Sequence, residues 1–112
     1  MKMLKVKPNQ KPICVDIENE LETLQREVGG YIEIVCPFED NIAIICNEEG
    51  KLYGLPINRW LYDNGICLDF LCGDILVAEE EEGDFVSMSD EHIEKYMNVF
   101  SNIKINMDEL GV

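Results

Sequence analysis

Residues 42–46 read Ile-Ala-Ile-Ile-Cys, the longest uncharged apolar stretch of this 112-residue chain. The stretch shows none of the alternation between apolar and polar residues that marks a half-buried strand. A short continuous apolar run is typical of a strand that is covered on both faces. We therefore expect residues 42–46 to form the central strand of a sheet.

The segments that flank this run predict two further strands. Residues 31–36 reach the run through a turn at 39–41, and a second turn at 47–50 leads on into residues 51–53. Strands joined by such short turns pair in antiparallel orientation, so we expect a three-stranded meander. One face of the first strand would hold three residues: Ile32, Ile34 and Cys36.

The first part of the chain predicts a hairpin followed by a helix. Leu4 and Val6 alternate with lysines, a turn spans residues 8–12, and a second period-two segment follows. Asp16 is a plausible N-cap for the helix, and Gly29-Gly30 would end it because glycine tolerates the left-handed conformation there. The apolar stripe of the helix has four members at helical spacing: Ile17, Leu21, Leu24 and Val28.

Residues 54–61 contain a proline, which cannot donate to a central strand and suits the first turn of a helix. We therefore predict a short helical turn that begins at Pro56 and carries Asn58 and Arg59. The turn 63–65 follows.

The last third predicts two strands and a helix. The strands are residues 74–78 and 85–88, and five acids at 79–84 indicate a solvated loop between them. Ser89 would cap the last helix, whose apolar stripe runs from Ile93 to Phe100. The tail from residue 102 carries apolar residues that suggest partial packing.

These elements predict one α+β domain over residues 1–112 with a mostly antiparallel sheet. The expected order is β-β-α-β-β-β, a short helical turn, then β-β-α. The opening hairpin, helix and strand are compatible with a β-grasp arrangement.

Charge excludes several classes of function. Nine basic and 23 acidic residues give a net charge of −14, which opposes binding to nucleic acid or to an anionic membrane.

No apolar run is long enough to span a bilayer, and we expect no signal peptide. Five cysteines, an odd number, favour free thiols in a cytosol. Charge is unevenly spread, because residues 1–15 hold four lysines and no acid.

The sequence offers little material for catalysis. His92 is the only histidine, and its place three residues after Ser89 is typical of an exposed helix end. Paired carboxylates are inevitable among 23 acids, and no phosphate-binding G-x-x-x-x-G-K loop is present. We expect no catalytic residue, no metal ion and no cofactor, and we leave open whether the protein is an enzyme while favouring that it is not.

Asn58 and Arg59 are the most unusual polar pair, because they stand between the apolar residues Ile57 and Trp60. Arginine presents a planar fork of donors that suits carboxylate or phosphate. One interpretation makes the pair a candidate ligand- or partner-binding site. The other is structural, with Arg59 held by an acid on a neighbouring turn, such as Glu48 or Glu49.

Several segments, in order, resemble the family named domain of unknown function 3846: residues 29–35, 47–52, 54–59, 72–77 and 84–90. The resemblance covers about residues 3–100 and leaves out the tail at 102–112. It implies a small intracellular bacterial protein, often carried by phages and plasmids. It implies no established activity and names no catalytic residue.

Our leading hypothesis is a non-enzymatic interaction protein of the cytoplasm, of mobile-element or phage descent, with a protein partner that the sequence does not identify. A second hypothesis is a small-molecule-binding protein or enzyme with its site around Asn58 and Arg59. A third is an acidic mimic of nucleic acid that inhibits a defence nuclease, because spaced carboxylates can replace phosphates. The sequence does not determine the oligomeric state.

Overall fold

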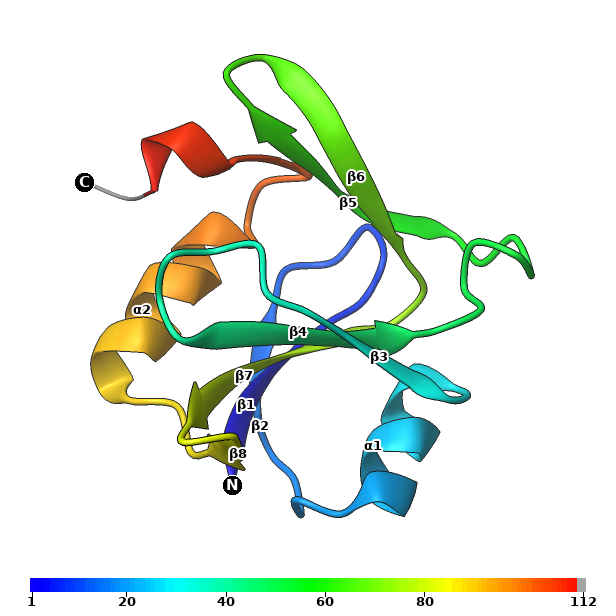
Figure 1. Cartoon of the computed structure of the whole chain (residues 1–112), viewed down its shortest axis with the longest axis vertical. Helices are drawn as coiled ribbons and strands as arrows, with labels where there is room; N and C mark the ends of the chain where they lie inside the picture. The colour runs from blue at the N-terminus through cyan, green and yellow to red at the C-terminus, as the bar shows by residue number, and fades with distance from the viewer. Residues whose placement is uncertain (111–112) are drawn as a thin grey trace.

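The computed structural model describes residues 1–110, which form two sheets, two α-helices and one short 3₁₀ helix (Figure 1). In chain order the elements are β1 (Lys2–Val6), β2 (Ile13–Asp16), α1 (Leu21–Val28), β3 (Ile32–Val35), β4 (Ile42–Asn47), β5 (Ile57–Asp63), β6 (Ile66–Cys72), β7 (Ile75–Glu81), β8 (Asp84–Val86), α2 (Asp90–Val99), β9 (Lys104–Asn106) and η1 (Met107–Glu109). The predicted α+β class is confirmed.

The larger sheet has the strand order β2-β1-β7-β4-β3, and β8 pairs with β7. Every pairing in it is antiparallel, including the long-range pairs of β1 with β7 and of β4 with β7. The opening hairpin, helix and strand that suggested a β-grasp arrangement are present. The apolar run at 42–46 lies in β4, between β3 and β7, and all five residues are buried.

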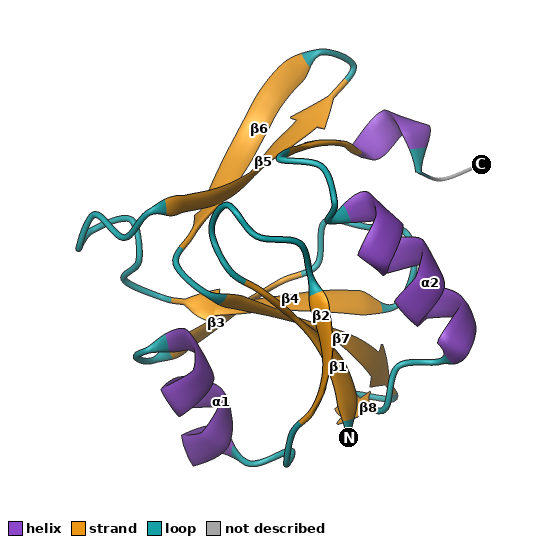
Figure 2. Ribbon diagram, turned by 180° about the vertical axis from the view of Figure 1, so that it is seen from behind, coloured by secondary structure: helices purple, strands orange, loops and turns teal. Residues whose placement is uncertain are grey.

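Two apolar clusters explain why β4 carries no polar alternation. Ile44 and Val77 face one side of the sheet, where α2 and the smaller sheet cover them. Ile45 and Leu76 face the other side, where α1 packs with Leu24 and Val28. Figure 2 shows the helices on opposite sides of the sheet. Both faces of β4 are thus removed from water, as the sequence predicted for residues 42–46.

The smaller sheet has the order β6-β5-β9, with β5 and β6 antiparallel and β5 and β9 parallel. It corrects two predictions. Residues 57–63 are strand β5, not a helical turn, because Pro56 lies just before the strand, where its missing donor costs no ladder bond. Residues 51–53 are a turn, not the third strand of a meander. Strand β6 was not predicted, and it pairs with β5 in the smaller sheet.

Helix α1 begins later than predicted. Asp16 ends β2 and its carboxylate binds the N-terminal amine of Met1, so it does not cap the helix. The N-cap is Glu20, which makes no side-chain capping bond, and Gly29 ends the helix in the left-handed conformation with φ of 80°. The C-terminal end was therefore predicted correctly and the N-terminal end was not.

The acidic run is not a solvated loop. Residues 79–81 extend strand β7, and a turn at 82–83 joins it to β8. Ser89 caps α2 as predicted, since its hydroxyl oxygen accepts from the backbone N–H of His92. The tail packs through β9, where Ile105 is buried. The last two residues of the predicted tail segment lie outside the described residues.

Within residues 1–110, no helix combines the length and the apolar character required to cross a membrane.

Candidate functional site

Asn58 and Arg59, the pair singled out in the sequence, lie at the start of β5 and are 1% and 2% exposed. The Asn58 side-chain amide donates to the carbonyl oxygens of Val6 (2.9 Å) and Gly73 (2.7 Å). It therefore joins the smaller sheet to two points of the larger one, the end of β1 and the turn before β7.

Arg59 makes five hydrogen bonds through its guanidinium group. Nε and Nη2 donate to the carbonyl oxygen of Phe100 (3.1 and 2.7 Å), and Nη2 also donates to that of Gln10 (2.6 Å). Nη1 donates to the backbone and side-chain oxygens of Asn58, both at 2.9 Å. Since guanidinium has five N–H groups, this cation is fully satisfied by the protein itself.

The sequence predicted that an acid such as Glu48 or Glu49 would bind Arg59. In the structure its guanidinium donates only to carbonyl oxygens. Phe100 is the C-cap of α2, and the last turn of that helix has no basic residue of its own. The helix C-terminus carries a partial negative charge, so Arg59 supplies the missing cation from a different strand. Burial lowers the pKa of Arg59 from its ordinary value. This geometry supports the structural interpretation, and a ligand role for the pair stays a prediction.

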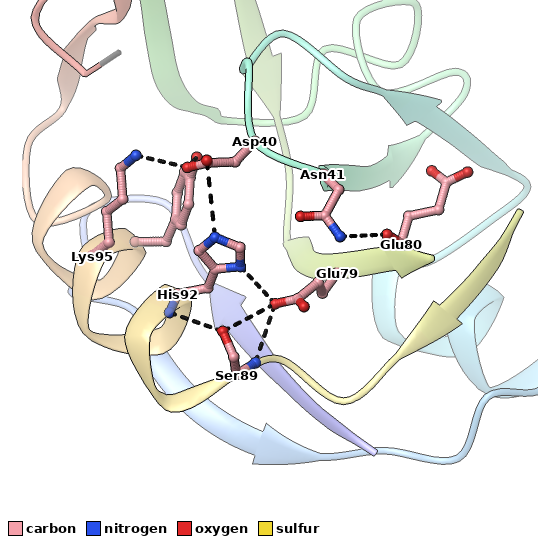
Figure 3. Close-up of polar contacts among 8 residues, drawn as sticks. Asp40, Asn41, Glu79, Glu80, Ser89, His92 and Lys95 are labelled. Atoms are coloured by element: carbon pink, nitrogen blue, oxygen red, sulfur yellow. Dashed lines mark hydrogen bonds and ion pairs between the residues drawn. The ribbon is translucent and has the colours of Figure 1, made fainter. Parts of the chain in front are cut away.

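A second polar cluster, which the sequence did not predict, surrounds His92 (Figure 3). Its Nδ1 lies 2.7 Å from Glu79 Oε1, and its Nε2 lies 3.9 Å from Asp40 Oδ1. The same Glu79 oxygen accepts from the backbone N–H of Ser89 (3.1 Å) and from its hydroxyl (3.4 Å). The His92 side chain is only 19% exposed, so the expectation of an exposed helix-end histidine was wrong.

Asp40 connects this cluster to the loop between β3 and β4. Its Oδ2 accepts from Lys95 Nζ (2.6 Å) and from the Tyr96 hydroxyl (2.8 Å). The next residue, Asn41, donates its side-chain amide to the Glu80 carbonyl oxygen (2.6 Å). The loop is thereby fixed to both α2 and β7.

The charges in the cluster shift the pKa values of both carboxyl groups. The hydrogen bond from Lys95, followed by that from Tyr96, lowers the pKa of Asp40. Burial by itself would raise the pKa of Glu79, but its hydrogen bonds with His92 and Ser89 outweigh burial and lower that pKa. Burial, followed by the hydrogen bond to Asp40, raises the pKa of Tyr96.

These shifts predict how stability depends on pH. A carboxyl group whose folded-state pKa is depressed stabilises the fold above its ordinary pKa of about 4, and that stabilisation is lost as pH falls through the lower, folded-state value. We expect Glu79→Gln to flatten the decline in the free energy of unfolding as the pH falls below about 4. Urea unfolding at a series of pH values measures this.

Glu81→Gln is the matched control, because Glu81 lies on the same strand and is exposed. It should leave the wild-type pH dependence unchanged. The same dependence of unfolding free energy on pH in wild type and Glu79→Gln would contradict the stabilising role assigned to the ionised Glu79 carboxylate.

The cluster borders a cleft of about 640 Å³ between the loop at 37–40, α2 and the end of the β5–β6 hairpin. Its lining is partly apolar: Pro37, Phe38, Leu68, Tyr96, Met107 and Leu110. The charged lining residues comprise four acids and one cation: Glu39, Asp40, Asp63, Asp108 and Lys95. Lys95 is already bound to Asp40, so three acids remain at the cleft without a cation among the described residues.

His92 is bound to carboxylates in this cluster and not to a hydroxyl or thiol. Both ring nitrogens of His92 face carboxylates, and the Ser89 hydroxyl lies against Glu79 instead of the ring. All five cysteines are unpaired, and burial raises the pKa of the Cys46 thiol to about 11, which keeps it un-ionised at neutral pH. Among residues 1–110, no group of three or more His, Cys, Asp or Glu side chains could hold a metal ion.

Fold and cleft together define a small acidic α+β protein with two sheets that share an apolar cluster and with an acid-rimmed cleft. The chain belongs to the family described as Domain of unknown function (DUF3846), which matches residues 1–101. No curated protein and no solved structure matches it.

Proposed function

We propose that the chain is a non-enzymatic interaction protein whose cleft takes a segment of a partner protein that carries basic and apolar side chains together. The observation that carries this proposal is the composition of the cleft. Apolar side chains from four separate elements line it, and three acids that no described cation neutralises stand around them.

Exposure and size support the proposal. Leu68 is 59% exposed beside the cleft, although apolar residues of this size gain most from burial. A volume of about 640 Å³ accommodates several side chains. The net charge of −14 would speed the approach of a basic partner and repel acidic ones. A bacterial cytosol and mobile-element descent, which the family resemblance implies, remain part of the proposal.

Selection from a displayed library of random 15-residue peptides tests the binding. We expect enriched peptides that combine Lys or Arg with large apolar residues. Their affinity should fall with increasing salt and should be lost in Leu68→Asp, which places a charge in the apolar part of the cleft. Leu52→Asp is the control, because Leu52 is 78% exposed on a distant turn.

Two triple variants distinguish the effect of the charge at the cleft from the effect of the net charge of the whole chain. Glu39→Gln, Asp63→Asn and Asp108→Asn together remove three acids from the cleft, whereas Glu18→Gln, Glu20→Gln and Glu22→Gln remove three acids near α1. Only the first set should weaken peptide binding. Failure to enrich basic apolar peptides, or equal effects of the two sets, would contradict the proposal. In a pull-down from a bacterial lysate with the tagged protein, recovery of a nuclease that DNA displaces would favour the nucleic-acid mimic.

A further inference from the structure

Two adjoining hollows lie on the other side of the larger sheet, beside the C-terminal end of α1. One has a volume of about 690 Å³ and includes Lys7 and Arg26 in its lining. The other has a volume of about 320 Å³ and includes Tyr31 in its lining. Gly29, Asn47 and Tyr53 line both hollows, so the two adjoin, and together we call them the tyrosine groove.

The larger hollow carries positive charge in a strongly acidic chain. Its two carboxylates, Glu27 and Asp74, share the buried ammonium of Lys5, which lies 2.8 Å from Glu27 Oε2 and 3.6 Å from Asp74 Oδ2. Lys7 and Arg26 are exposed, and within residues 1–110 neither forms an ion pair. Three cations (Lys5, Lys7 and Arg26) against two carboxylates give this end a net charge of +1, and Lys7 and Arg26 are the cations that an anion can reach.

The smaller hollow carries aromatic surface. Tyr31 and Tyr53 both line it, and they are 67% and 69% exposed. Aromatic side chains left so open to solvent offer their faces to a planar ring. The half-buried carboxylate of Glu49 lies in the same hollow, where its hydrogen bond with the Tyr53 hydroxyl raises the pKa of Tyr53; its other lone pairs can accept from a ring amino group.

We propose that the tyrosine groove binds a small anionic molecule with a planar ring, of the nucleoside monophosphate class. The ring lies against Tyr31 and Tyr53, and the phosphate lies toward Lys7 and Arg26. Arginine and lysine are the side chains that bind phosphate best, and the volumes of the two hollows, about 690 and about 320 Å³, each lie in the range typical of a small-molecule site. The net charge of −14 disfavours a nucleic-acid polymer but opposes a single phosphate far less.

Isothermal titration with AMP tests this proposal. We expect binding at submillimolar concentration, at least tenfold weaker binding of adenosine, which lacks the anion, and at least tenfold weaker binding of inorganic phosphate, which lacks the ring. CMP should bind more tightly than UMP, because only CMP offers Glu49 an amino group. Equal affinities for AMP and phosphate, or no binding of any nucleotide at 5 mM, would overturn the proposal.

Variants locate the site. Lys7→Ala with Arg26→Ala, and separately Tyr53→Ala, should each weaken AMP binding at least tenfold. All three residues are exposed, so the fold should be retained, which circular dichroism checks. Lys2→Ala with Lys104→Ala changes the net charge equally at positions outside the groove and should leave affinity within twofold. Weakening by this control as large as that of the groove variants would show non-specific attraction and overturn the site.

Discussion

Arg59→Ala should destabilise the protein by about 3–5 kcal/mol and lower its melting temperature by roughly 12 °C or more. The side chain is 2% exposed and donates to Phe100, Gln10 and Asn58. Removing it leaves buried carbonyl oxygens without a donor and takes the cation away from the C-terminal end of α2. Thermal unfolding followed by circular dichroism, together with urea unfolding, measures the loss.

Arg26→Ala is the matched control, since it removes the other arginine of the chain from an exposed position. It should change stability by less than about 0.5 kcal/mol. Arg59→Lys keeps the charge but has only three donors in a different geometry, so it should recover little of the loss. Wild-type stability for Arg59→Lys would show that charge alone matters and would contradict the role of the planar fork.

Ile45→Ala should cost about 2–5 kcal/mol. Ile45 lies in the central strand β4 with no exposed surface, and it packs in the cluster that α1 covers. Truncation removes buried apolar surface and leaves a cavity that the antiparallel strands on both sides prevent from closing. Urea unfolding at neutral pH measures the change.

The control for this prediction is the register partner of Ile45. Ile34 lies opposite it on β3 and on the same face of the sheet, but it is 48% exposed. Ile34→Ala should therefore cost less than about 1 kcal/mol. Similar losses for the two variants would mean that the two partners are equally buried and would contradict the position of β3 at the sheet edge.

Local sequence was sufficient to predict the elements whose structure depends on neighbours in the chain. The run at 42–46 is apolar at every position because β4 has strands on both sides and clusters on both faces. Gly29 ends α1 and Ser89 begins α2 because the backbone conformation or side-chain oxygen needed there belongs to that one residue. Such signals act over at most four positions and need no tertiary partner.

The segment around Pro56 shows where this reasoning fails. A proline at the start of a segment is equally suited to a helix and to the residue before a strand, and the choice depends on pairing. Here the pairing is with β6 and β9, and β9 lies more than 40 residues further along the chain. Local propensity contains no information about a partner at that distance.

The candidate sites depend on tertiary structure to a still greater degree. The sequence identified Asn58 and Arg59 as unusual, yet the carbonyl groups that bind Arg59 carry no sequence signature, because every residue has one. His92, Glu79 and Asp40 come from α2, β7 and the β3–β4 loop, and no spacing links them. Composition determined the acidic character of the protein, and the continuous apolar run at 42–46 determined the centre of its larger sheet. Which acids gather beside apolar residues, and which cations remain unpaired, was decided only when distant segments packed together.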